Sequence, residues 1–283
     1  MCVPCGDAHG VMHGEKPKNN WNEAFEHLTF TDDYIFKLVM ERVELFKAVL
    51  ALILPAVDVE RLTSLETEKP MTLDYFLHGV RFDILARGLK KLIDVEIQVL
   101  DTGELPERAL YYLASLIVSS LKKGQTYNLL GESYVVFFCK FDPFGKGRPV
   151  YEFQLACNGL AKLKLTDKVR VVFYNAPAWR KCKNKALRAL LRYMMTGEAT
   201  SELTRKIDAA VSEAKHNSKT RGGWNMLYET MVQQYDKGIS LGFDRGSHER
   251  AVDTAQRALT RGFAPDVVAE ITGLPLEEVN SLL

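Results

Sequence analysis

The sequence predicts an α/β fold in which a mixed β-sheet is flanked by helices, followed by a helical C-terminal region. Two observations favour this fold class. Apolar runs of strand length alternate along the chain with longer amphipathic runs of helical periodicity. The chain has 283 residues, 47% of them apolar, which is enough for one sizeable core and an appended helical region.

Composition narrows the classes of function. The net charge of +1 gives the chain no overall attraction to nucleic acid, so DNA binding would need a local basic patch. No apolar stretch approaches the roughly 20 residues that span a bilayer, and the longest, at 48–57, is interrupted by Pro55. The five cysteines are an odd number without the spacing of a disulfide framework, so we expect reduced thiols. The N-terminus lacks a signal-peptide core, and we expect a cytoplasmic protein that makes no membrane contact.

The first long helix is expected at YIFKLVMERVELF (34–46), where apolar residues recur at helical spacing. Asp32 and Asp33 stand at its start. Aspartate is favoured as the N-cap and in the first turn of a helix, where it complements the helix dipole. We therefore interpret Asp32 as the N-cap of this helix.

Two strands joined by a tight loop follow. The apolar runs GVRFDILAR (79–87) and KLIDVEIQVL (91–100) are typical of strands, and the residues between them are typical of a hairpin loop. The simplest hairpin pairs Gly88 with Lys91.

This register brings acids together. It sets Asp83 opposite Glu96 and Arg81 opposite Gln98. Residues two apart on a strand share a face, so Asp94, Glu96 and Gln98 point the same way. Cβ atoms of directly paired residues lie about 4.5–5.5 Å apart, which lets two carboxylates reach one cation. Without a cation, like charges placed opposite each other are destabilising.

The pattern therefore suggests a divalent-metal site. Mg²⁺ is usually held by one or two carboxylates together with waters and substrate phosphate. Asp83 and Glu96 match that requirement, and the backbone carbonyl of Ile97 could add a third oxygen. Gln98 would then orient a water or a phosphate oxygen. The alternative is that these acids are solvated residues on the open face of an antiparallel sheet.

Further elements complete the predicted core. A helix is expected over 107–121, with Leu110, Leu113, Ala114, Ile117 and Leu121 as its apolar stripe. Strands are expected at 134–141, 150–157 and 168–176, with a turn-rich loop at 142–149.

Four segments resemble one known family. They are TFTDDYIFKLVM (29–40), GVRFDILARGLKKLIDVEIQ (79–98), ERALYYLASLIVSSLKKGQTYNLL (107–130) and FDPFGKGRPVYEFQLAC (141–157). They are similar to the Rpn family of recombination-promoting, transposase-like nucleases in the PD-(D/E)XK nuclease superfamily. The resemblance runs from about Trp21 to the C-terminus. It implies the restriction-endonuclease-like core, an endonuclease activity on DNA that depends on Mg²⁺ or Mn²⁺, and a link to recombination or mobile elements.

The resemblance also assigns roles to residues. It makes Asp83 the first acid and Glu96 the second, and it places Gln98 where the superfamily has a lysine. The preceding helix often contributes a further acid, for which Asp33 is the candidate. Arg108 would face the acids and meet a phosphate oxygen, although a salt bridge to a neighbouring glutamate is an equal alternative.

Gln98 changes the chemistry, because an amide cannot supply the positive charge of an ammonium group. A lysine from elsewhere could compensate, and we name four candidates that are otherwise surface charges: Lys90, Lys91, Lys122 and Lys123.

Two other functions remain open on the sequence. One is a DNA-binding or protein-interaction module that keeps the nuclease fold without catalysis. The other is a toxin or defence nuclease that is silenced until a trigger arrives.

Outside the core, we expect a flexible leader at 1–20, a nuclease-like domain at 21–196 and a helical region at 197–283. The leader contains Cys2, Cys5, His9 and His13, which could hold zinc but more simply belong to a disordered segment. The most basic stretch, 180–192, is either a solvated helix face or a contact for the DNA backbone. A flexible break is expected at 215–223. The last two short helices, within 262–283, resemble part of a helix-turn-helix, but Glu277 and Glu278 would repel phosphate, so they are expected to pack or to form a homo-oligomer rather than to read DNA.

Overall fold

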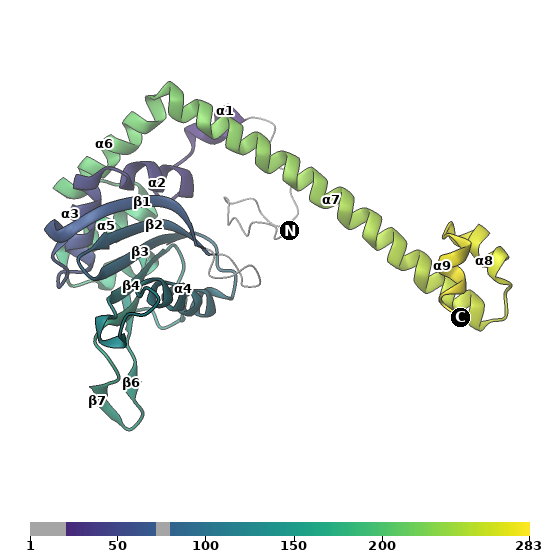
Figure 1. Cartoon of the computed structure of the whole chain (residues 1–283). Helices are drawn as coiled ribbons and strands as arrows, with labels where there is room; N and C mark the ends of the chain where they lie inside the picture. Colours follow the sequence, from purple (N-terminus) through teal and green to yellow (C-terminus); the bar gives the residue numbers. More distant parts are fainter. Residues whose placement is uncertain (1–20, 72–79) are drawn as a thin grey trace. The chain divides into compact units, whose positions relative to one another are not determined.

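The computed structural model describes residues 21–71 and 80–283, and a six-stranded mixed sheet forms the core of its first compact unit (Figure 1). The strand order is β1-β2-β3-β4-β8-β5, and β6 and β7 form a separate pair. β1, β2 and β3 are antiparallel, β3, β4 and β8 are parallel, and β5 is antiparallel to β8. The strands are β1 Leu62–Met71, β2 Val80–Gly88, β3 Lys91–Gln98, β4 Glu132–Cys139, β5 Val150–Phe153, β6 Ala156–Cys157, β7 Leu160–Lys164 and β8 Val169–Asn175.

Helices lie on both faces of this sheet, which confirms the predicted fold class. The helices are α1 Trp21–Glu26, α2 Asp33–Met40, α3 Val43–Ile53, η1 Val59–Arg61, α4 Leu105–Ser119, η2 Tyr127–Leu129, η3 Ala176–Lys181, α5 Lys185–Thr196, α6 Glu202–His216, α7 Ser218–Thr260, α8 Pro265–Thr272 and α9 Leu276–Asn280. None of the described helices is long and apolar enough to cross a membrane.

Alternation along β4 shows how the two layers are built. Phe137 packs against Tyr112 of α4 on one face, with ring centroids 6.2 Å apart. Phe138 packs against Phe36 of α2 on the other, at 6.5 Å. Because neighbouring strand residues point to opposite faces, one apolar run serves both cores. The sheet is therefore fixed between α4 and the layer that contains α2 and α3.

The hairpin register is the one that the sequence predicts. Gly88 pairs with Lys91, and the ladder continues as far as Ile84 with Val95. It stops there because the next N–H, that of Asp83, donates to the side chain of Glu96. The predicted pairing of Arg81 with Gln98 is therefore wrong. Arg81 pairs with β1 instead.

Two local predictions about helices are also wrong. The helix expected over 34–46 is divided into α2 and α3, because Arg42 adopts an extended conformation between them. The apolar stripe of α4 is offset from the expected one, since Leu110 is 63% exposed. The buried positions of this helix include Leu105, Ala109, Leu113 and Leu116. Both stripes have helical spacing, and only the position of the sheet selects between them.

The chain forms two compact units, the first ending at Trp224 and the second covering 225–283. The first continues past residue 196, the expected end of the nuclease-like domain, because α6 packs against α2 and α3. An interruption lies within 215–223, where a flexible break is expected, but it is one residue long, and its flexibility stays a prediction. Asn217 alone separates α6 from α7, and its side chain accepts the N–H groups of Lys219 and Thr220. Division into functional domains stays a prediction.

The second unit contains most of α7 together with α8 and α9. Its small apolar core consists of Ala255, Val268, Leu274 and Val279. His248 of α7 approaches Glu278 of α9 at 3.0 Å. The terminal hairpin thus packs against its own long helix, and an oligomer formed through it stays a prediction.

Candidate active site

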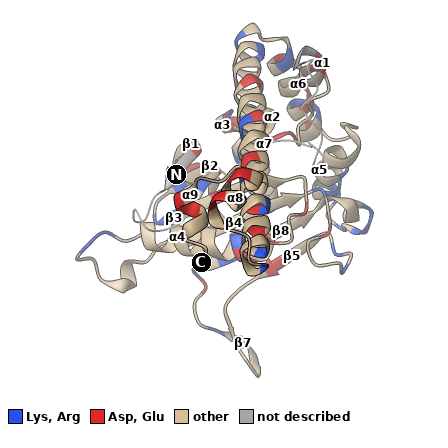
Figure 2. Ribbon diagram, turned by 90° about the vertical axis from the view of Figure 1, so that its right-hand side faces the viewer, with Lys and Arg blue, Asp and Glu red and all other residues tan. Residues whose placement is uncertain are grey.

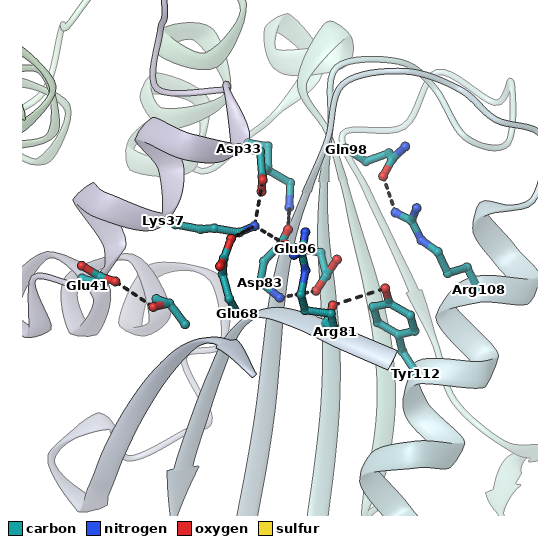
Figure 3. Close-up of polar contacts among 12 residues, drawn as sticks. Asp33, Lys37, Glu41, Glu68, Arg81, Asp83, Glu96, Gln98, Arg108 and Tyr112 are labelled. Carbon is teal, nitrogen blue, oxygen red and sulfur yellow. Dashed lines mark hydrogen bonds and ion pairs between the residues drawn. The ribbon is translucent and has the colours of Figure 1, made fainter. Parts of the chain in front are cut away.

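Asp83 and Glu96 face each other near the carboxyl end of β3, where backbone hydrogen bonds hold both carboxylates (Figure 3). The N–H of Asp83 donates to Oε1 of Glu96 at 2.8 Å. The N–H of Ile97 donates to Oδ2 of Asp83 at 3.4 Å. Each acid is therefore oriented by the strand of the other, so the hairpin itself positions the pair.

Burial makes this acid pair costly to ionise. Asp83 has a side chain that is 14% exposed, and Glu96 is buried. Burial and repulsion from Asp33 raise the pKa of Asp83 to about 6, although Lys37 opposes both effects. Burial, then the charges of Asp83 and Asp94, hold the pKa of Glu96 well above its ordinary value. A bound cation would stabilise the ionised forms of these carboxyl groups.

Asp94 lies behind Glu96 on the same face of β3 and is fully buried. Its two carboxylate oxygens accept no N–H group from the described residues, although a hydrogen bond with the carboxyl of Glu96 lowers its pKa in part. Burial, together with the charge of Asp83, raises its pKa well above the ordinary value. Burial therefore favours the neutral form of Asp94 in the metal-free site.

Lys37 of α2 is the residue that the sequence reasoning missed. It is only 5% exposed, and its Nζ lies 2.7 Å from Asp33, 3.2 Å from Asp83 and 3.3 Å from Glu68. Burial alone would lower the pKa of Lys37, but the carboxylates of Asp83 and Asp33 outweigh it and the pKa lies above the ordinary value. The site thus contains a permanent positive charge beside its first acid.

Part of this signal was present in the sequence. Asp33 and Lys37 are four residues apart, a spacing that pairs opposite charges on a helix. The contact between Lys37 and Asp83, by contrast, depends on the packing of α2 over β2.

The four lysines proposed to compensate for Gln98 do not approach the acids. Lys91 pairs with Glu132 at 2.6 Å, at the opposite end of β3. Lys90 is in the hairpin turn, and Lys122 and Lys123 are exposed beyond the end of α4. Lys37 on α2 is nearer to the acids than any of these residues. Lys37 on α2 is therefore the lysine that the structure places beside the acid pair.

Gln98 has both ends of its amide engaged. Its Nε2 donates to the carbonyl of Leu100 at 2.7 Å, and its Oε1 accepts a hydrogen bond from the guanidinium of Arg108. Arg108 also lies over the ring of Phe137, 5.4 Å from its centroid. Gln98 therefore fixes the guanidinium of Arg108 at the carboxyl end of β3. Its predicted role in orienting water is not tested by these contacts.

The two aspartates at the start of α2 have different partners. Asp32 occupies the N-cap position, but its side chain makes no capping bond. Oδ2 of Asp32 instead accepts from the N–H and hydroxyl of Thr29, at 2.6 and 2.9 Å, so Asp32 is the N-cap by position but its side chain does not cap the helix. Asp33 accepts a hydrogen bond from the ammonium of Lys37, which also contacts Asp83.

The donor set fits a cation that needs few protein ligands. No three His, Cys, Asp or Glu side chains converge on one point within the described residues. Two opposed carboxylates are nevertheless what Mg²⁺ commonly takes from a protein when substrate phosphate completes the shell. The Ile97 carbonyl as a third ligand stays a prediction. Cys2, Cys5, His9 and His13 lie outside the described residues.

Comparison with known proteins supports the assignment of the fold. None of the curated proteins matches the chain. The family described as PD-(D/E)XK nuclease family transposase matches residues 30–221. This range contains both acids, Lys37, Gln98 and Arg108, and it covers more than half of the chain. The chain therefore belongs to the PD-(D/E)XK nuclease family of transposases.

Proposed function

We propose that the protein is a DNA endonuclease that requires Mg²⁺, for which Mn²⁺ can substitute, and that it serves recombination or a mobile element. The observation that supports this function best is the opposed pair Asp83 and Glu96. Glu96 is buried and Asp83 is 14% exposed, each carboxylate accepts a backbone N–H, and Lys37 contacts Asp83 alone of the two acids. Family membership supports the nuclease class. The activity is expected in the cytoplasm, with DNA as the partner.

Asp83 and Glu96 would hold the cation. When bound, a divalent cation supplies Lewis acidity towards a phosphoryl oxygen and makes water a better nucleophile at neutral pH. Lys37 keeps the site ready for the cation, because its ammonium lowers the pKa of Asp83 and favours the charged form that binds metal.

Arg108 would bind a non-bridging oxygen of the scissile phosphate. Its guanidinium stays charged throughout the physiological pH range and can donate to two oxygens at once. Gln98 holds that guanidinium in place through its own oxygen. The amide at the usual lysine position thus has a positioning role, and Lys37 and Arg108 supply positive charge on opposite sides of the acids.

Nicking of supercoiled plasmid DNA tests this function. We expect Asp83→Asn and Glu96→Gln to abolish nicking in Mg²⁺ and Mn²⁺, while circular dichroism shows that both variants fold. Glu132→Gln is the matched control, because Glu132 is also paired with a lysine but lies at the opposite end of β3 and β4. It should cleave like the wild type.

The competing function is a module that binds DNA without cutting it. It predicts binding that is independent of divalent ions and no nicking by the wild type. Retained nicking in both acid variants would exclude the proposed site, and absence of nicking by the wild type under either ion would favour the binding module.

A further inference from the structure

Unpaired basic residues gather at the end of the sheet where the acid pair lies. The strands β3, β4 and β8 are parallel and end level with one another, Gln98 beside Cys139 and Cys139 beside Asn175. Segments that follow these strands therefore emerge at the same end as Glu96. Lys140 follows β4 directly, and η3 follows β8 directly.

Lys140 is the basic residue next to the site. Its N–H donates to the carbonyl of Gln98 at 3.0 Å. Its Nζ donates to the hydroxyl of Thr31 at 3.2 Å, two residues before Asp33. The side chain therefore extends from the end of β4 towards the start of α2, and it remains partly exposed.

The loop 142–149 brings two more basic residues beside η3. Nζ of Lys181 donates to the carbonyl of Gly147 at 3.0 Å, and the amide of Asn175 donates to the carbonyl of Arg148 at 2.9 Å. Lys146 and Arg148 are exposed on this loop. The loop and η3 thus present their basic side chains from one surface.

The acid in this loop does not neutralise them. Asp142 accepts from the N–H of Gly147 at 2.6 Å and from the hydroxyl of Tyr151 at 2.7 Å. These bonds hold its carboxylate within the loop. Burial would raise its pKa, but the hydrogen bonds from Tyr151 and Gly147 lower it overall.

Trp179 provides an aromatic platform on the same surface. The guanidinium of Arg180 lies 4.4 Å from its ring centroid, and that of Arg192 lies 5.4 Å away. Arg192 is paired with Glu198, whereas Arg180 is exposed. Stacking limits the freedom of the Arg180 side chain, which lowers the entropic cost of binding an oxygen anion.

Five residues define this surface, and we call them the edge cations: Lys140, Lys146, Arg148, Arg180 and Lys181. None of them has a carboxylate partner within 21–71 or 80–283. Elsewhere charges of both signs are interspersed along the ribbon (Figure 2), in keeping with a net charge of +1. A local excess of unpaired positive charge beside the acids calls for a partner that carries repeated negative charge.

We propose that the edge cations bind the phosphate backbone of DNA and lead it across the ends of β8 and β4 to Asp83 and Glu96. This inference rests on the proposed function and adds the surface that the substrate uses. Binding through phosphates is independent of base sequence, and each contact releases condensed counterions. The affinity must therefore fall with salt in proportion to the number of edge cations engaged.

Fluorescence anisotropy with a labelled DNA duplex in EDTA tests the surface without cleavage. The variants are Arg180→Gln with Lys181→Gln, and Lys146→Gln with Arg148→Gln. Each pair should weaken binding and lower the slope of log K against log salt concentration by about 1.8, at about 0.9 per lost phosphate contact. Lys122→Gln with Lys123→Gln is the matched control, because these exposed lysines follow α4 and precede β4. The control should bind like the wild type.

The outcomes separate this inference from the proposed function. The inference is overturned if both edge variants, folded by circular dichroism, keep the wild-type affinity and salt slope. If the wild type binds through the edge cations but never nicks DNA with Mn²⁺, DNA binding by the edge cations is supported and the endonuclease function is refuted. If it nicks while both edge variants bind and nick unchanged, the endonuclease stands and the surface fails. A wild type that binds no DNA in EDTA overturns the surface, and nicking in Mn²⁺ still decides the endonuclease.

Discussion

Replacing Lys37 by methionine removes the positive charge at the centre of the acid cluster and keeps most of the volume of the side chain. Lys37 is 5% exposed, and its ammonium contacts three carboxylates within 3.3 Å. The substitution leaves the carboxylate of Asp83, which is 14% exposed, without its cationic partner. We expect a loss of stability that depends on pH, and a loss of turnover.

The size of the stability loss depends on how exposed each partner of Lys37 is to solvent. Removing one member of a buried ion pair costs about 3–5 kcal/mol. The side chains of Asp33 and Glu68 are 29% and 55% exposed, so their pairs contribute no more than about 1 kcal/mol each. Asp83 can escape part of the cost by taking up a proton, since its pKa is already about 6. We therefore expect Lys37→Met to lower the free energy of unfolding by about 2–3 kcal/mol at pH 8, and by less at pH 5.5.

Urea unfolding in EDTA, followed by circular dichroism at both pH values, measures this effect. Lys47→Met is the matched control, because Lys47 of α3 pairs with Glu60, whose side chain is 76% exposed. An ion pair in contact with solvent contributes little to stability, so the control should change little at either pH. Added Mn²⁺ should stabilise Lys37→Met more than it stabilises the wild type, because a bound cation replaces the missing charge.

Turnover should fall even when Mn²⁺ restores stability. A preorganised charge in an active site contributes about a hundredfold or more to the rate. The reasoning is refuted if Lys37→Met is as stable as Lys47→Met at pH 8. It is refuted equally if the loss of stability is the same at pH 5.5 as at pH 8.

Three further predictions concern the acids and Gln98. In metal-free protein the pKa of Asp83 is about 6, against about 3.9 in an unfolded chain, so its contribution makes the free energy of unfolding fall as pH rises from about 4 through about 6. Asp83→Asn should flatten that part of the pH profile measured by urea unfolding, and an unchanged profile would contradict the assignment. Glu96→Gln should abolish nicking, yet in metal-free protein at pH 8 it should raise the free energy of unfolding by about 1 kcal/mol, because a buried amide carries no ionisation cost. A less stable variant would argue that the buried carboxylate of Glu96 does not destabilise the protein. Gln98→Lys restores the usual superfamily residue but buries an ammonium beside Arg108, so it should lower the free energy of unfolding by about 2–4 kcal/mol and leave the nicking rate no higher than that of the wild type. A faster enzyme would show that Arg108 can move aside.

The acid pair was accessible to sequence reasoning because its geometry is local. Alternation along a strand and a two-residue turn place Asp83 near Glu96 whatever the rest of the chain does. The same reasoning failed for Arg81, where a side chain interrupts the ladder. It also failed for the apolar stripe of α4, since Leu110 has the right spacing but faces away from the sheet.

By itself, then, the sequence determined the mixed α/β class, the hairpin and the family, because each depends on short-range periodicity or on motifs in order. The tertiary structure decided which charges meet. Lys37 reaches Asp83 through the packing of α2 over β2, and Arg108 reaches Gln98 because α4 lies on the other face of the sheet. Contacts between residues 46 and 10 positions apart form only after separate elements pack, and packing depends on the whole core rather than on any local pattern.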